Sequence, residues 1–495
     1  MRYLLPLAVL LALPGAAPRL AADEYYDNFN FNIAARMNRL EAENEALRAE
    51  MQWMRDSAVR PPVVQAAPPM PANAGMPANS GVPPYAAMPA NPGVPAYGVM
   101  PASAAMAPAA GGEDYYTLPQ LQAEMKKLAW TKGDFKIVPY GFLWGNIVYA
   151  TERTSPGSYT LFVQSASVQG ENEFITDVRN TRLGFDVTGP RIAFFNGAQS
   201  GGKVEIDFQN SVLSTENKPT IMLRHAYFEV KDEESRLLVG QTWDVISPLL
   251  PGMLMYSVGW DGGNIGYRRA QFRAERFLAF SDFTLVTAQG SLNQTVFEDV
   301  ITNVRGEPPG WPIVEGRVAV TLGDRCPTGL PITFGCSGHI GEEGFDFTGV
   351  PGRDDVRRRT WSVNGDLRVP LTHYLGFQCE FFTGENLGAF LGGIGQGIDP
   401  VTFNCIRTQG GWCELWYDWT PCFHSHFGYS IDDPNDNDLT AVGSKTYNQF
   451  YFCNFIYDFT KSFLVGLEVS SWRTLYLGQL PGESVRCEFV MKYGF

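Results

Sequence analysis

Arginine side chains that alternate with apolar residues are the feature of this sequence with the clearest chemical potential. Arg269, Gln271, Arg273 and Glu275 occupy every second position of one stretch, so in an extended strand they share one face. Alternate positions on that face lie about 7 Å apart, which places the two arginines about 13 Å apart. Rings or walls of arginine in a water-filled channel select for anions. We therefore expect these residues to create an electric field that sorts solutes by charge, without any bond-making chemistry.

Arginines also lie on the polar faces of several other predicted strands. The candidates for the pore wall and for solute contact are Arg182, Arg224, Arg269, Gln271, Arg273 and Arg368, together with Arg486. The direction of Arg224 stays open, because both faces of its stretch are mostly apolar. Arg268 lies on the opposite face from Arg269, where a long side chain can reach the membrane edge. The alternative for every arginine is a structural role, in which it solvates the wall and pairs with neighbours such as Glu205 and Asp207.

Sites for other chemistry are weakly indicated. Cys422, His424 and His426 alternate and could share a face toward a metal ion, but they follow Thr420 and Pro421 and fit equally well a turn that enters a strand. The sequence has no Gly-x-Ser-x-Gly elbow, His-Glu-x-x-His motif or phosphate-binding loop. We expect no metal site, no cofactor and no enzymatic activity, with an outer-membrane hydrolase as the remaining enzymatic alternative.

The stretch Val485–Phe495 shows which elements would carry such a wall. One face holds Val485, Cys487, Phe489, Met491, Tyr493 and Phe495, and the other holds Arg486, Glu488, Val490, Lys492 and Gly494. In a soluble sandwich the apolar face meets a core, whereas in an outer-membrane barrel it meets lipid and the polar face meets a watery lumen. An aromatic last residue resembles the signal that the barrel-assembly machinery reads, so we expect Phe495 to act as an assembly signal.

The same contrast of apolar and charged faces recurs from about residue 133 to residue 495. Roughly 360 residues at about 22 per strand and connection give about 16 strands, within the even-numbered series of bacterial barrels. The composition, with 13% aromatic residues and 51 glycines, suits many strands and tight turns. We predict an all-β fold, an antiparallel transmembrane β-barrel of about 16 strands over residues 133–495. Two Gly- and Pro-rich stretches, Glu307–Arg353 and Asp432–Lys445, are expected to be long loops.

The start of the chain predicts export. Residues 1–22 combine a positive beginning, an apolar run over Leu4–Leu13 and small residues suited to cleavage, which is the pattern of a signal peptide. No later apolar run is long enough for a membrane-spanning helix. The formal net charge of −14 argues against a nucleic-acid partner. We expect the outer membrane as the location, with membrane lipid as the surroundings of the barrel.

Export also implies an oxidising compartment for the eight cysteines. Their spacing does not match a compact disulfide framework. Cys326 and Cys336 flank a Gly- and Pro-rich stretch and could close a loop, whereas Cys413, Cys453 and Cys487 lie on apolar strand faces, where cysteine behaves as a small hydrophobic residue. The disulfide pairing therefore stays open.

Residues 23–60 predict a parallel coiled coil in the periplasm. The d positions are Ile33, Leu40, Leu47 and Met54, and the a positions are Met37, Asn44 and Met51. Three g-to-e pairs, Arg36–Glu41, Glu43–Arg48 and Glu50–Arg55, are opposite in sign, and a polar Asn at an a position fixes the register. One amphipathic helix on a domain is the simpler alternative. About three heptads are marginal alone, so the barrels would have to help hold the chains together.

Residues 61–112 are rich in Pro, Ala and Met and nearly free of charge, with repeats such as those at Met70, Met76 and Met88. Such a stretch cannot bury a core and predicts an extended, partly polyproline linker. At about 3.1 Å per residue, some 50 residues reach roughly 150 Å at the limit, which suits a periplasmic spacer. A short helix is predicted over residues 113–132.

Seven motifs of the predicted barrel, in the same order, resemble those of the DcaP-like porins. They are Thr181–Asp186, Leu223–Tyr227, Leu238–Trp243, Gly263–Arg273, Phe382–Leu387, Gly428–Asp433 and Leu467–Thr474. The resemblance implies a trimeric, 16-stranded barrel with an N-terminal coiled coil that passes small, mostly anionic organic acids, dicarboxylates among them. The long Pro-, Ala- and Met-rich linker and the cysteines depart from the pattern of that family.

Two functional hypotheses follow. The first is an outer-membrane porin for passive diffusion of small hydrophilic, anionic solutes. The second is a structural barrel that tethers the outer membrane to the cell wall, with peptidoglycan as the partner of the coiled coil and linker. Both can hold for one chain. Deletion of residues 33–112 distinguishes them, because it should spare the conductance of a porin but abolish the cell-wall binding of a tether.

Overall fold

The computed structural model describes residues 130–495, apart from 169, 196, 211–218, 297–304, 327–328 and 348–353. The predicted signal peptide, coiled coil and linker lie outside the described residues, as does most of the helix predicted over residues 113–132. The last three residues of that predicted helix form a short strand, β1. In the described ranges, no helix is long and apolar enough to cross a membrane.

Strands make up nearly all of the regular structure. They are β1 (Trp130–Lys132), β2 (Phe135–Ala150), β3 (Thr154–Pro156), β4 (Thr160–Val163), β5 (Glu173–Asp177), β6 (Arg182–Ile192), β7 (Ala198–Asp207), β8 (Met222–Lys231), β9 (Ser235–Trp243), β10 (Arg268–Ser281), β11 (Thr284–Asn293), β12 (Arg305–Glu307), β13 (Ile313–Leu322), β14 (Ile332–Asp346), β15 (Val356–Pro370), β16 (Leu375–Glu385), β17 (Arg407–Thr420), β18 (Phe423–Pro434), β19 (Lys445–Asp458), β20 (Phe463–Tyr476) and β21 (Gly482–Gly494). The described helical turns are η1 (Ala193–Phe195), η2 (Gly388–Phe390) and η3 (Asp436–Asp438).

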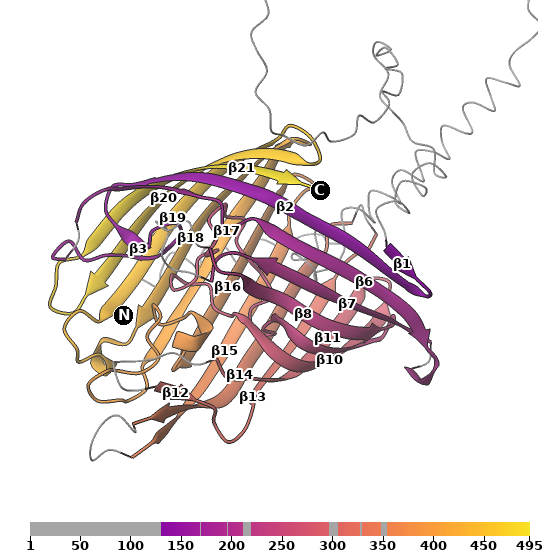
Figure 1. Cartoon of the computed structure of the whole chain (residues 1–495), viewed down its shortest axis with the longest axis horizontal. Coiled ribbons are helices and arrows are strands. Elements are labelled where there is room, and N and C mark those ends of the chain that lie inside the picture. Colours follow the sequence, from indigo (N-terminus) through magenta and orange to yellow (C-terminus); the bar gives the residue numbers. More distant parts are fainter. Residues whose placement is uncertain are drawn as a thin grey trace, which may run out of the picture. The chain divides into compact units, whose positions relative to one another are not determined.

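Sixteen of these strands form one closed antiparallel barrel, as predicted. Each long strand pairs with its neighbour in the chain, and β2 closes the ring by pairing with β6 on one side and β21 on the other. Figure 1 shows this seam, where the indigo strand β2 runs beside the yellow strand β21. The short strands β1, β5 and β12 extend the sheet by pairing with β2, β2 and β14, while β3 and β4 form a separate small ribbon.

The two faces of the wall have inverted polarity compared with a soluble protein. On β21, Phe489 and Met491 are exposed on the outside, whereas Arg486 and Glu488 are only 1% exposed on the inside. Alternation places apolar side chains outward and polar ones inward, and this arrangement is typical of a barrel in lipid. The predicted assignment of faces for this strand is confirmed.

Aromatic rings gather at the end of the barrel where the connections are short. Tyr417 packs on Trp419 with 4.7 Å between ring centroids, and Phe459 contacts both Tyr457, at 4.9 Å, and Phe463, at 5.5 Å. Such rings form the girdle at a membrane–water interface, and short turns are typical of the periplasmic end of these barrels. The long connections, including residues 244–267 and 386–406, lie at the other end of the strands.

The expected loop over Glu307–Arg353 is wrong in most of its length. This stretch contains β13 and β14, which pair along nine residues. Glycines at positions such as 335, 338 and 341 in β14 weaken the alternation that marks a strand. The second expected loop is shorter than its predicted bounds, since β18 continues to Pro434 and β19 starts at Lys445.

The seam depends on a close fit between Gly141 of β2 and Phe495. The backbone N–H of each residue donates to the carbonyl of the other, at N–O distances of 3.2 and 3.0 Å. A Cβ atom at position 141 would lie 2.9 Å from the Phe495 ring and 2.6 Å from the Arg182 carbonyl oxygen. The missing side chain of Gly141 therefore provides the space that the last aromatic ring occupies.

We predict that Gly141→Val slows assembly, because the added side chain displaces the Phe495 ring and overpacking of this kind costs about 1–3 kcal/mol. The rate at which the heat-modifiable, folded band appears on a gel measures this. Gly145→Val is the matched control, since Gly145 lies on the same face of β2 and has nothing within 4 Å of an added Cβ. Equal assembly rates for the two variants would show that the seam does not require the glycine.

Candidate functional site: the lumen and its inward loops

Residues 244–267, which connect β9 to β10, fold into the lumen, and we call them the constriction loop. Their side chains are largely buried, including Ile246 and Met255 at 1% exposure each. The base of this loop is closed by two hydrogen bonds of 2.8 Å, in which the Asp244 amide donates to the Tyr267 carbonyl and the Tyr267 amide donates to the Asp244 carboxylate. The loop thus leaves the wall and returns to it at the same place.

Four carboxylates on the inner wall hold the constriction loop by its backbone. The amide donors and carboxylate acceptors are Val245 to Glu315 (2.7 Å), Leu249 to Glu380 (2.8 Å), Gly252 to Glu414 (2.6 Å) and Leu254 to Glu468 (2.7 Å). These acceptors belong to β13, β16, β17 and β20, so the loop follows the wall across much of the barrel. Each contact gives a buried backbone N–H the acceptor that it requires. We call these four residues the carboxylate row.

The returning half of the loop is held by polar side chains of other strands. The Tyr256 hydroxyl donates to the Asp207 carboxylate of β7 at 3.1 Å. The Ser430 hydroxyl of β18 donates to the Gly262 carbonyl at 2.6 Å. Both halves of the constriction loop are therefore attached to the wall, and its position follows from contacts that are far apart in the sequence.

A second connection, residues 386–406 between β16 and β17, also folds inward and braces the first. The Asp261 amide donates to the Leu391 carbonyl at 2.9 Å, and the Gly266 amide donates to the Phe390 carbonyl at 2.8 Å. Arg269 donates from Nη2 to the Ala389 carbonyl at 2.6 Å, and its guanidinium lies 3.8 Å from the centre of the Phe390 ring. Arg269 thus links β10 to both inward connections.

The predicted group on β10 comes together on one face, as expected. Arg269 forms an ion pair of 3.0 Å with Asp244, and neither side chain is accessible beyond 1%. Gln271 donates to backbone carbonyls and accepts from Arg273 Nε at 2.8 Å. Arg273 also pairs with Glu275 at 3.3 Å and remains 10% accessible. Of the two arginines, Arg273 is the one that reaches the open lumen.

Arg224, whose direction the sequence leaves open, points into the lumen because of a β-bulge. In the pairing of β7 with β8, Glu205 is opposite His225 and Ile206 is opposite Leu223, which leaves Arg224 as the extra residue. A bulge of this kind re-aims a side chain. Arg224 and His225 are both buried, and Arg224 forms ion pairs of 2.7 Å with Glu205 and with Asp207.

The remaining arginines lie on the wall in different surroundings. Arg182 pairs with Glu205 at 3.5 Å and is 23% accessible, and the Arg368 guanidinium lies 5.0 Å from the Trp416 ring centre. Arg486 pairs with Glu488 at 2.5 Å and is fully buried.

Arg268 does not reach the membrane edge. It is 3% exposed, with its guanidinium 4.7 Å from the Trp243 ring centre and 4.9 Å from that of Tyr267. These rings belong to the end of β9 and the base of the constriction loop, so they draw the side chain inward at the start of β10.

A cavity of about 160 Å³ opens in the lumen beside the constriction loop. Its charged lining consists of five cationic side chains, Arg182, Lys203, Lys231, Arg236 and Arg273, and three carboxylates, Glu205, Asp244 and Glu275. Sequence reasoning missed Lys203, Lys231 and Arg236 because it considered only arginines on the clearest strands. Lys203 alternates with Glu205 and Asp207 on β7, and this pattern could have identified it.

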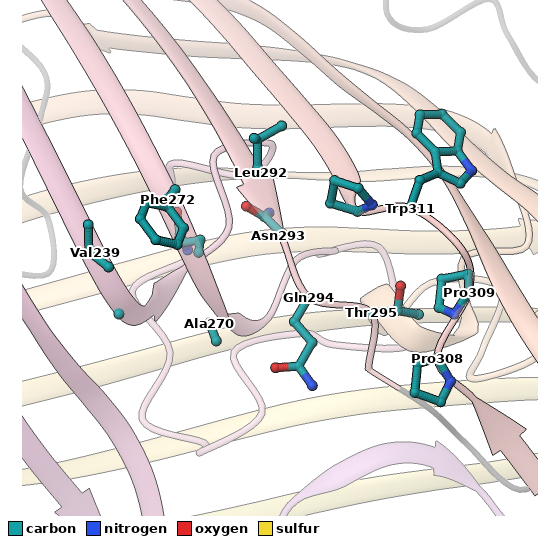
Figure 2. A pocket seen from close by; sticks show the side chains of 13 residues that line it. Val239, Ala270, Phe272, Leu292, Asn293, Gln294, Thr295, Pro308, Pro309 and Trp311 are labelled. Atoms are coloured by element: carbon teal, nitrogen blue, oxygen red, sulfur yellow. The ribbon is translucent and has the colours of Figure 1, made fainter.

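A hollow of about 490 Å³ lies on the other side of the wall. Figure 2 shows its lining, with Val239, Phe272 and Leu292 on neighbouring strands and Trp311 beside the prolines of the connection to β13. Phe272 and Leu292 are 65% and 51% exposed on the outer face. This hollow belongs to the apolar exterior and not to the pore.

The stretch Cys422–His426, weighed above as a metal site, forms a turn and the start of β18. His424 contacts Asp418 at 2.8 Å and Asp458 at 3.3 Å, next to the short turn between β17 and β18. Cys422 is exposed in that turn. Over the described ranges of the chain, His, Cys, Asp and Glu side chains form no group of three or more that is placed to hold a metal.

Three solved structures of outer-membrane proteins are similar to this chain to different degrees. The outer membrane channel DcaP of Acinetobacter baumannii is 18% identical with a TM-score of 0.59, over 74% of this chain and 99% of that chain. An anion-selective porin from Comamonas acidovorans is 10% identical with a TM-score of 0.46, over 73% and 100% of the two chains. OprB of Pseudomonas putida is 9% identical with a TM-score of 0.46, over 76% and 97%. No protein-family model and no curated protein matches the sequence.

We predict that Glu468→Ala loosens the constriction loop near Leu254. The substitution removes the acceptor of the Leu254 amide and of the Asn454 side chain, and a buried donor left without a partner costs about 1–3 kcal/mol. Amide hydrogen exchange of peptides that cover residues 249–256 should become roughly tenfold faster or more. Thr321→Ala is the control, because Thr321 faces the lumen but bonds only to Thr333 of the next strand. Equal exchange in the two variants would contradict the role of the carboxylate row.

Proposed function

We propose that the protein is an outer-membrane porin through which small hydrophilic anions, carboxylates and dicarboxylates among them, diffuse passively. The observation that carries this proposal is the charge of the lumen cavity, where five cationic side chains face three carboxylates. A diffusion channel requires a watery lumen and a field at its narrow part, and no catalytic group. The barrel with polar side chains inside and apolar ones outside supports the membrane location.

The acidic side of the barrel does not cancel this field. Glu315, Glu380, Glu414 and Glu468 form the carboxylate row, and each accepts an amide of the constriction loop. The loop lies along these carboxylates on the lumen side, and the amide dipoles point their positive ends at them. The cationic side chains of β6 to β10 pair with neighbouring carboxylates of the wall, among them Arg182 with Glu205, Lys203 with Asp186 and Arg273 with Glu275. The cavity lining still has five cationic side chains to three carboxylates, so we expect a solute there to meet an excess of positive charge.

The overall charge of −14 does not decide the selectivity. Charges on the outer surface are screened beyond a Debye length of about 8–10 Å at physiological ionic strength. The side chains that line the cavity act on a solute at contact distance, where screening is weak. Local charge therefore outweighs bulk charge in this account.

We further propose a trimer whose chains are joined by the coiled coil over residues 23–60, on the basis of the resemblance and of the matched g-to-e charges. Insertion through the barrel-assembly machinery belongs to the same proposal. The likeness of the barrel to the DcaP channel is one of fold, and it is compatible with this arrangement.

We predict that Arg182→Ala with Arg273→Ala shifts the reversal potential toward cation preference. The double variant leaves three cationic side chains against three carboxylates in the cavity lining, so the preference for anions should fall nearly to zero. Bilayer recordings across a tenfold salt gradient measure the shift, and block by a dicarboxylate should weaken in parallel.

Arg276→Ala is the matched control. Arg276 is on the same strand as Arg273 but on the outer face, where its side chain is 52% accessible and pairs with Glu234. This change should leave the reversal potential where it is in the unmodified channel. A double variant that behaves like the control would remove Arg182 and Arg273 from the solute path.

A further inference from the structure

Two cysteines face each other across neighbouring strands of the barrel wall. Cys379 of β16 and Cys413 of β17 are direct partners in the antiparallel ladder. They lie on the outward parity of their strands, with Phe381 and Leu415 as exposed neighbours on the same face. Side chains of directly opposed residues on one face are the closest pairs in a sheet.

The ladder places this pair where a disulfide can form. The Asn386 amide donates to the Ile406 carbonyl at 2.9 Å, which marks these residues as a hydrogen-bonded pair at the end of the same ladder. Pair types alternate along an antiparallel ladder, and Cys379 is seven positions from Asn386, so Cys379 and Cys413 form a non-hydrogen-bonded pair. The Cα atoms of such pairs are about 4.5 Å apart, within the range of roughly 4.4–6.8 Å that disulfides span.

The two thiols already interact, since they are close enough to share a hydrogen bond. The other cysteines of the wall have no such partner. Cys336 is opposite Gly365, and Cys453 and Cys487 both face Val469 of the strand between them. Two strand spacings, about 9.5 Å, separate Cys453 from Cys487, which is too far for a bond.

We propose that Cys379 and Cys413 are joined by a disulfide in the mature protein, formed by thiol–disulfide exchange with an oxidant of the disulfide class. The two thiols lose two hydrogens, the Sγ–Sγ bond forms, and the disulfide of the oxidant is reduced to two thiols. This inference rests on the proposed location, because export brings the chain through an oxidising compartment. The exchange takes place before the folded wall buries Cys379.

The bond would crosslink β16 and β17, the two strands that carry the inward connection over residues 386–406. This connection leaves the wall from β16 and returns on β17, and it supplies the Ala389 and Phe390 carbonyls that brace Arg269 and the constriction loop. A crosslink between the two strands limits how far they can separate. The proposed disulfide thus stabilises the frame on which the constriction is built.

The test is differential alkylation of the full-length protein. Acid-quenched envelope protein is denatured and alkylated without reductant, then reduced and alkylated with a second reagent of different mass. Cys379 and Cys413 should carry the second label, while Cys453 and Cys487 carry the first. A non-reduced digest should contain the peptide of Cys379 linked to that of Cys413. In the Cys379→Ala variant, Cys413 should have a free thiol and therefore carry the first label.

First-label modification of Cys379 and Cys413 in the unmodified protein would overturn the proposal, and so would a linked peptide that joins Cys413 to another cysteine. Reductant should lower the temperature at which the folded band is lost in the unmodified protein and leave that of Cys379→Ala unchanged. Conductance of the same preparation tests the proposed porin function separately from the proposed disulfide. A preparation that conducts but has free thiols at Cys379 and Cys413 would refute the disulfide and leave the porin function standing.

Discussion

The arrangement of the lumen depends on the hydrogen bonds between the carboxylate row and the backbone of the constriction loop. A loop that crosses a barrel must satisfy its amide groups, because buried backbone donors without acceptors are costly. Here Glu315, Glu380, Glu414 and Glu468 accept four of those amides. The same contacts fix the loop in space and engage the acidic wall. The position of the constriction loop and the electric field of the acidic part of the wall therefore depend on the same hydrogen bonds.

The opposite arc of the barrel carries the cationic side chains that line the lumen cavity. Arg224 and Arg269 are buried in ion pairs with Glu205, Asp207 and Asp244, and they shape the wall more than they contact the lumen. Arg182 and Arg273 stay partly accessible, together with the lysines of β7 and β8. The inner wall thus divides into arginines that position other groups and cations that face water. This division accounts for a basic cavity in a chain that is acidic as a whole.

The faces of the strands could be predicted from sequence, because alternation is a local property that β21 shows without interruption. The route of the loops could not, since the Leu254 amide and its acceptor Glu468 are 214 positions apart and no local pattern links them. The inward direction of Arg224 depends on a β-bulge, in which one extra residue of β8 has no partner in the ladder. No pattern in the sequence marks that bulge. The glycines of β14 made a strand resemble a loop. The group on β10 was predicted on one face, but its division into buried and accessible arginines depends on the inward loops.

The central claim is that local charge in the lumen, and not the net charge of the chain, sets the selectivity. The most direct measurement is the reversal potential of the unmodified protein in a planar bilayer, at the same tenfold gradient centred on low and on high salt. This account predicts anion preference at both salt levels, because a Debye length that falls from about 30 Å at 0.01 M to about 3 Å at 1 M screens the outer-surface charges but acts little on side chains at contact distance. Cation preference at low salt would contradict it.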